Sequence, residues 1–274
     1  MKRQFMFSVK AFLKSSKCFK CIVFALLAAA FLEFRMFSGQ NELFNLGNPD
    51  YGFFLIASGN ILDLFIISLP ILAILPFGDT YYKEQEFINQ ILTRSSKASY
   101  LVVNTLMSFL TGFLFIFLLL GFMYVLNYLM LNPSADNPLY CISSTVVENN
   151  NMPIVTHSFF VTELLENPAV YNWIYIFILS AYAGLLSMTT FSISLCVKKK
   201  IVAYISPFAI TLISIPVCNF LPAEFQRWTP NLVFSPGGST VFTNQEWALL
   251  FWVSFFLIIT ISFNMYKYRK DVLE

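Results

Sequence analysis

The chain has 274 residues, of which 57% are hydrophobic and only 12% are charged. Soluble domains carry about twice that share of charged residues, so the composition excludes an ordinary soluble domain and predicts an integral membrane protein. The net charge of +2 says little by itself, and the five cysteines lack the regular spacing of a disulfide framework.

Residues 1–20 are predicted to form a basic amphipathic helix at the membrane interface. Apolar and basic residues fall on different sides of a helical wheel: Phe5, Val9, Phe12 and Leu13 against Arg3, Lys10, Lys14 and Lys17. Such a helix is held by apolar insertion and by attraction to anionic lipid. Cys18 and Cys21 form a CxxC pair, but no second pair completes a four-ligand zinc site, so two reduced thiols are the favoured interpretation.

Six apolar segments are each long enough to be a membrane-spanning helix. They cover residues 19–37, 52–77, 100–131, 173–197, 201–220 and 247–266. We therefore expect an all-α integral membrane protein with six transmembrane helices in one domain over residues 1–274. Residues 132–171 and 221–245 are the predicted outer loops, and residues 78–99 form a long loop on the other side.

The basic residues predict the orientation, because Lys and Arg gather on the cytoplasmic side of membrane proteins. Of the 17 Lys and Arg residues, only Arg35 and Arg227 fall on the opposite side from the rest. The others lie in residues 1–20, in the 78–99 loop, in the turn at residues 198–200 and in the tail after residue 266. Both termini are therefore predicted to be cytoplasmic.

The 78–99 loop is predicted to contain a short amphipathic helix. Asp79 and Thr80 are residue types that accept hydrogen bonds from a first helical turn. A helix favours negative charge in its first turn and positive charge in its last, as with Glu84 and Glu86 near the start and Arg94 and Lys97 near the end. Apolar residues at three- and four-residue spacings form a stripe on one face: Phe87, Ile88, Ile91 and Leu92. Two interpretations stay open, a helix resting on the membrane or its own bundle, and a helix that docks on a cytoplasmic partner.

Asp63 lies near the middle of the second predicted span, where a carboxylate costs at least ~2.5 kcal/mol. It is a candidate intramembrane polar site. The favoured alternative is a structural role, with a hydrogen bond to Asn60 or a neighbouring span, or a reach toward Arg35.

Small residues spaced by four predict close approach between helices; the pairs are Ser180 and Gly184, Ala183 and Ser187, and Ser108 and Gly112. Cys141 and Cys218 could form an outer disulfide.

Catalytic patterns are missing from the sequence. His157 is the only histidine and lies in an outer loop, so a His-pair metal site or a His-based triad cannot be built within the chain. No G-x-x-x-x-G-K-[ST] motif occurs, so the chain has no P-loop for ATP. We expect a protein that is not an enzyme, with no catalytic residue, no metal ligand and no cofactor of its own.

The topology and the 75–100 region resemble ABC-2 type permeases, the membrane subunits of bacterial ABC transporters. The local match runs from Leu75 and Pro76 through Asp79 and Tyr81, then over residues 91–94 to Tyr100. The resemblance implies that the loop is a coupling helix docking on an ATPase subunit, through Glu84, Glu86, Phe87, Ile91 and Arg94. The chain departs from the family pattern in lacking a mid-loop Gly, in having Asn104 where relatives often have Lys, and in its larger 132–171 loop.

The resemblance also implies the partners and the location. Two permease subunits, identical or homologous, would work with a cytoplasmic ABC ATPase that holds ATP and Mg, in the bacterial cell membrane and without nucleic acid. An amphipathic or lipid-like substrate such as an antimicrobial peptide, exported or cleared, fits the aromatic, nearly uncharged spans. The alternative is a non-transporting sensor or assembly component that binds a ligand or partner through residues 132–171. An intramembrane enzyme is disfavoured by the absent His and acid clusters.

Overall fold

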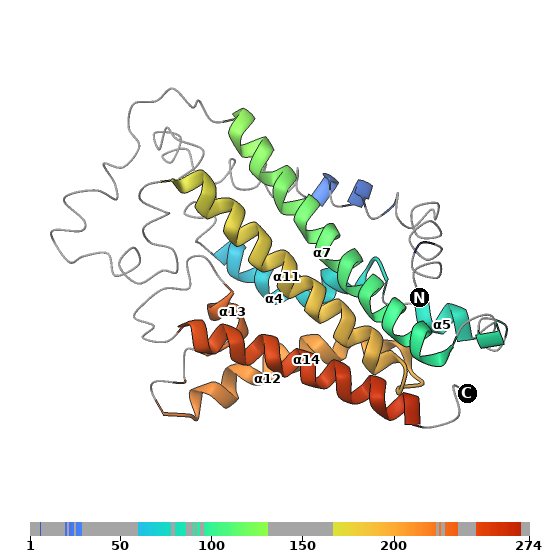
Figure 1. Cartoon of the computed structure of the whole chain (residues 1–274). Coiled ribbons are helices and arrows are strands. Elements are labelled where there is room, and N and C mark those ends of the chain that lie inside the picture. Colours follow the sequence, from blue (N-terminus) through green and yellow to red (C-terminus); the bar gives the residue numbers. More distant parts are fainter. Residues whose placement is uncertain are drawn as a thin grey trace.

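The computed structural model describes residues 6, 20, 22–24, 26–28, 60–77, 80–85, 90, 92–93, 96–130, 167–222, 225, 228–234 and 245–269. The regular structure of these residues is helical. The main helices, shown in Figure 1, are α4 (Asn60–Ile74), α5 (Thr80–Glu84), α7 (Lys97–Met130), α11 (Pro168–Ser194), α12 (Lys200–Asn219), α13 (Pro230–Val233) and α14 (Gln245–Arg269).

Four of these helices, α7, α11, α12 and α14, are long and apolar enough to cross a membrane. They coincide with the last four predicted spans, which confirms the prediction of helices of membrane-spanning length and apolarity for this part of the chain. The second predicted span contains α4, whose apolar part is the shorter segment Phe65–Ile74. Residues 20, 22–24 and 26–28 of the first predicted span are described and are helical. The rest of that span, like most of residues 1–20 and 132–171, lies outside the described residues.

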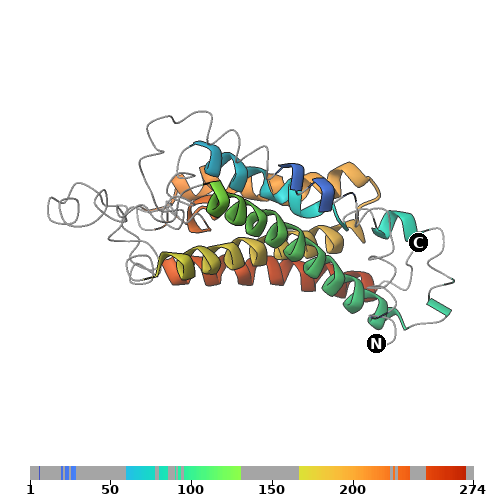
Figure 2. The same ribbon diagram turned by 90° about the horizontal axis from the view of Figure 1, so that it is seen from above.

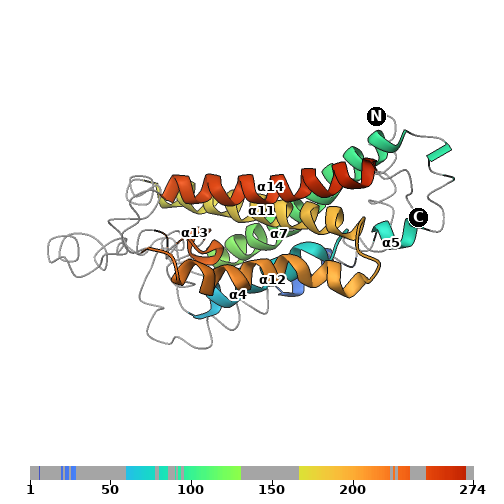
Figure 3. The same cartoon turned by 90° about the horizontal axis from the view of Figure 1, so that it is seen from below.

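Helix α11 is the centre of the bundle and packs against α4, α7, α12 and α14. It lies between α7 and α14 in Figure 1, while α4 and α12 run side by side on another face of it (Figures 2 and 3). Its large side chains fill the core, with Tyr175, Ile176, Leu179, Leu186 and Phe191 all at most 2% exposed. Several of its buried Ser and Thr hydroxyls bond to carbonyls of their own helix, as Thr190 does to Leu186, so these polar groups are satisfied at the centre of the bundle.

The contact between α7 and α11 depends on small residues. A Cβ atom on Gly112 would lie 2.6 Å from the Cβ of Ser187, and one on Gly184 would lie 2.8 Å from the Phe109 ring. Ser108 donates a 2.8 Å hydrogen bond to the Ser187 carbonyl oxygen. The close approach that the small-residue spacing predicts is therefore confirmed for this helix pair.

We expected residues 221–245, between α12 and α14, to form only a loop. The described part of this segment instead folds back into the bundle. Helix α13 is followed by Phe234, whose ring stacks on that of Tyr182 at a centroid distance of 3.9 Å. The indole N–H of Trp252 donates a hydrogen bond to the Trp228 carbonyl oxygen. Aromatic side chains therefore close this end of the bundle, because their rings find partners in α11 and α14.

Candidate functional site

Helix α5 lies at the end of the bundle where α7 begins and where α11 and α14 end (Figure 1). The turn after α4 brings it there, and the Thr80 N–H donates a 3.0 Å hydrogen bond to the Phe77 carbonyl oxygen. Phe77 and Tyr81 are buried, at 4% and 3% exposed. The start of the predicted cytoplasmic loop is therefore anchored on the bundle.

A buried group of side chains, here called the α5 cluster, holds this helix in place. The α5 cluster consists of Phe77, Tyr81, Tyr100, Leu101, Val103, Met107, Phe191 and Leu195. The rings of Phe77 and Phe191 lie 6.1 Å apart between centroids, a separation typical of paired aromatic side chains. Leu92, from later in the loop, packs against the same cluster. The loop thus contributes to the core of the bundle at both its start and its later part.

Two hydrogen bonds fix α5 to different neighbours. The Tyr100 hydroxyl, from the first turn of α7, donates a 2.8 Å bond to Glu84 Oε2. The Tyr82 hydroxyl donates a 2.7 Å bond to the carbonyl oxygen of Val197, in the turn between α11 and α12. Together the two bonds tie α5 to the start of α7 and to the α11–α12 turn.

Two lysines connect the end of α14 to the same region. The Lys267 ammonium lies 6.0 Å from the centroid of the Tyr81 ring, and the Lys267 side chain is only 7% exposed. Lys97, the first residue of α7, donates a 2.9 Å hydrogen bond to the Tyr268 carbonyl oxygen. A desolvated cation over an aromatic face is an attractive contact. Helix α5 is therefore in contact with α7, with the α11–α12 turn and with α14.

This end of the bundle is strongly basic. The described cations here are Lys83, Lys97, Lys198, Lys199, Lys200, Lys267 and Arg269. The two tyrosines of α5 nevertheless stay neutral phenols at physiological pH. Burial, and then the neighbouring Tyr81, raise the pKa of Tyr82 to about 12. Burial, and then Cys196, raise the pKa of Tyr81. The Tyr82 phenol therefore keeps the proton that it donates to the Val197 carbonyl oxygen.

The long helices are also joined to one another in this half of the bundle. Asn264 of α14 donates a 3.1 Å hydrogen bond from Nδ2 to Thr105 Oγ1 of α7. The hydroxyls of Thr189 in α11 and Thr260 in α14 lie 3.2 Å apart. These side-chain bonds link α14 to α7 and to α11.

Of the five predicted docking residues, the structure describes Glu84. It is half-buried and bonded to Tyr100, so it faces its own bundle. Glu86, Phe87, Ile91 and Arg94 lie outside the described residues, and their docking role stays a prediction.

Helix α5 begins at Thr80, as predicted for the helix of the 78–99 loop, and differs from the prediction at its later end. Helix α5 ends at Glu84, and Lys97 begins α7 instead of closing the loop helix. Ser96 is the reason, because its Oγ accepts a hydrogen bond from the Ser99 N–H and its carbonyl oxygen accepts one from the Tyr100 N–H. A Ser in this position satisfies the unpaired N–H groups of a new helix.

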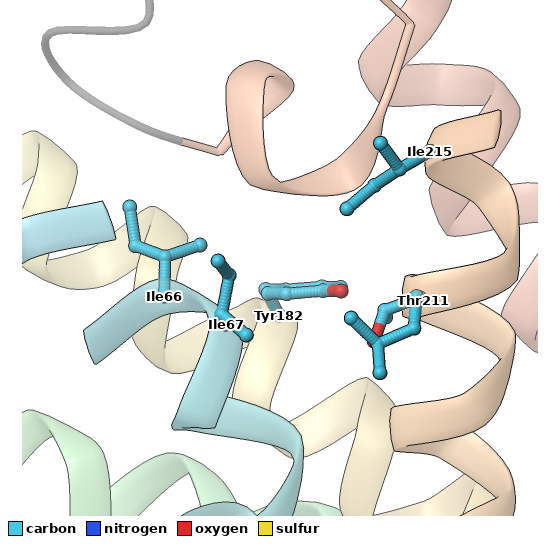
Figure 4. Close-up of a pocket in the computed structure, with 6 residues that line it drawn as sticks. Ile66, Ile67, Tyr182, Thr211 and Ile215 are labelled. Carbon is cyan, nitrogen blue, oxygen red and sulfur yellow. The ribbon is translucent and has the colours of Figure 1, made fainter. Parts of the chain in front are cut away.

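Asp63 lies in α4, one turn before Ile66 and Ile67, and its side chain is outside the described part of the structure. Ile66 and Ile67 line a small cavity between α4, α11 and α12, with Tyr182, Thr211, Leu212 and Ile215 (Figure 4). The Tyr182 hydroxyl points toward Thr211 (Figure 4). The cavity volume of about 10 Å³ suits one water molecule and is far too small for a peptide.

The sequence interpretation missed Tyr82, Tyr100 and Lys267 as residues of this site. The signal that could have found the tyrosines is the adjacent pair Tyr81 and Tyr82 at the predicted helix start, because aromatic residues are enriched near the membrane surface.

Among the residues that the structure describes, no group of three or more His, Cys, Asp or Glu gathers as a metal site. Cys218 is a buried free thiol, and Cys141 lies outside the described residues.

The described contacts of this site join the loop helix α5 to α7, to the α11–α12 turn and to α14. No protein-family model, curated protein or solved structure matches the chain.

Proposed function

We propose that the chain is the permease subunit of an ATP-driven ABC transporter and exports or clears an amphipathic substrate such as an antimicrobial peptide. The ATPase is a separate cytoplasmic subunit that binds ATP and Mg. The proposal rests on the resemblance of residues 75–100 to ABC-2 type permeases and on one observation, the seating of α5 on the bundle. In this proposal the bundle lies in a bacterial plasma membrane with its basic end in the cytoplasm.

The observation that carries the proposal is that α5 contacts α7, the α11–α12 turn and α14 through three different residues. Tyr82 reaches the α11–α12 turn, Glu84 meets Tyr100 of α7, and Tyr81 lies under Lys267 of α14. A force on the loop after α5 would reach all of these contacts together. Packed helices respond by shifting between discrete arrangements, because close-packed interiors do not deform continuously. ATPase closure could in this way bias the bundle between inward-open and outward-open states.

The substrate pathway is proposed to lie between two such subunits, identical or homologous. The cavity beside Tyr182, about 10 Å³ in volume, suits a water molecule and not an amphipathic peptide. A second subunit would enclose a larger pathway at the interface between the two subunits. The aromatic, weakly charged helices of both subunits would line this pathway.

Purification from the native membrane tests this function. The tagged chain, solubilised in mild detergent, should bring down a P-loop ATPase that mass spectrometry identifies. The reconstituted complex should hydrolyse ATP faster when an amphipathic cationic peptide is added. A monodisperse preparation of the chain that brings down no P-loop ATPase would contradict the proposal and favour a sensor or assembly component.

A further inference from the structure

The exposed face of α14 carries a hollow near its basic end. Ser262, Met265, Tyr266 and Arg269 line it, with a volume of about 420 Å³. Spacings of three and four residues place these side chains on one face of the helix. Helix α14 lies along one edge of the bundle (Figures 2 and 3), so the hollow opens away from the other described helices.

Among the described residues that line this hollow, the charged one is Arg269, which is positive. Arg269 is exposed, and the two carboxylates whose side chains the structure describes lie elsewhere. Glu84 accepts the Tyr100 hydrogen bond, and Glu246 is at the opposite end of α14. A guanidinium that lines the same hollow as the Tyr266 side chain suits a phosphate group, since Arg donates two parallel hydrogen bonds to phosphate oxygens.

The hollow continues into an apolar strip that leads toward the middle of the bundle. Ile258, Ile261 and Met265 are 63%, 54% and 50% exposed. The rise from Arg269 to Ile258 is about 16 Å at 1.5 Å per residue. This length is close to half of a bilayer's hydrocarbon core, which is about 30 Å thick. The strip therefore has the length of the acyl chains in one leaflet.

We propose that this hollow binds one anionic phospholipid of the leaflet at the basic end. Arg269 pairs with the lipid phosphate, the Tyr266 hydroxyl faces the headgroup, and the acyl chains lie along Met265, Ser262, Ile261 and Ile258. Anionic lipids concentrate in the cytoplasmic leaflet and attract basic segments near its surface. The site is independent of the proposed ATPase.

The position of the site gives the lipid a structural effect. Lys267 and Tyr268, the residues between Tyr266 and Arg269, make the contacts with Tyr81 and Lys97. A lipid held at Arg269 therefore orders the same helical turn that holds α5 and the start of α7. Bound lipid stabilises the folded bundle by mass action.

Native mass spectrometry of the delipidated, detergent-solubilised full chain tests the site. The protein is titrated with phosphatidylglycerol and with phosphatidylcholine of the same acyl chains. We expect the first phosphatidylglycerol to bind at least tenfold more tightly than phosphatidylcholine. Arg269→Gln should remove that preference, whereas Lys199→Gln, an exposed cation in the α11–α12 turn at the same end, should change it by less than twofold.

A second variant separates a defined site from general attraction to the basic surface. Met265→Trp keeps every charge but fills the hollow, so it should weaken phosphatidylglycerol binding as Arg269→Gln does. Equal binding of the two lipids by the wild type, or equal loss in the Arg269 and Lys199 variants, would overturn the proposal. Complete displacement of the lipid by equimolar glycerol phosphate would also overturn it, because a headgroup site alone needs no acyl strip.

Discussion

The Tyr82 hydroxyl donates a 2.7 Å hydrogen bond to the backbone carbonyl oxygen of Val197, and so joins the loop helix α5 to the turn between α11 and α12. The two residues are 115 positions apart in the chain. Val197 directly precedes the three lysines 198–200, so this contact fixes one basic turn of the bundle against another basic loop.

Removing that bond should loosen α5 without disturbing the rest of the fold. Tyr82→Phe deletes only the donor, and the loss of one such hydrogen bond costs about 1 kcal/mol. We expect a lower thermal midpoint in detergent. Tyr128→Phe is the matched control, because Tyr128 is 45% exposed near the other end of α7. Equal midpoints for the two variants would show that the Tyr82 bond contributes nothing.

The close approach of α7 and α11 predicts a difference between two glycines of the same helix. Gly112→Ala forces a Cβ to within 2.6 Å of the Ser187 Cβ, and overpacking of this kind costs about 2 kcal/mol. Gly121→Ala places its Cβ 3.9 Å from Trp173 Cη2, which is an ordinary contact. Denaturant unfolding should show a loss for Gly112→Ala alone; equal stability of both variants would contradict the packing.

Alkaline pH should weaken the bundle through α5. The pKa of Tyr82 is raised from 10.0 to about 12 by burial and then by Tyr81, so the folded state binds this proton more tightly than the unfolded state. The resulting stabilisation is complete below pH 10 and is lost as the pH rises through about 12. Wild type should therefore lose stability over this window faster than Tyr82→Phe. Parallel curves would show that Tyr82 is not the group responsible.

The orientation can be read from cysteine labelling with an impermeant reagent. The positive-inside rule predicts that a cysteine at Asn150 reacts from outside the cell and that one at Gln90 reacts only after permeabilisation. Each is made in a background whose native cysteines are replaced, with unlabelled parent as the control. The reverse pattern would place the basic end outside and remove the proposed docking surface from the cytoplasm.

The long helices could be predicted from the sequence because hydropathy over a span is a local property. The predicted segment 201–220 and the observed helix Lys200–Asn219 differ by one residue at each end. The close approach at Gly112 was also readable, since it needs only small residues at helical spacing. What local patterns could not give is a pairing such as Tyr82 with Val197 or Phe234 with Tyr182, because these depend on how distant helices pack. Lys97 was misplaced because Ser96 was not recognised as the start of α7.

The docking role of the loop is the central claim, and it depends on residues after α5. Phe87 and Ile91 are spaced by four, so a helix would present them on one face. Anchors of this kind typically carry at least ~2 kcal/mol each of the binding energy. A matched control is Leu114→Ala with Leu118→Ala, also spaced by four but exposed on the apolar face of α7 at 50% and 49%.

The most direct measurement is a quantitative pull-down of the ATPase by the Phe87→Ala and Ile91→Ala double variant, at equal monodisperse expression. We predict that association falls by more than tenfold, which corresponds to a loss of more than ~1.4 kcal/mol, and that the Leu114 and Leu118 control retains the ATPase. Undiminished pull-down by the Phe87 and Ile91 variant would contradict the account.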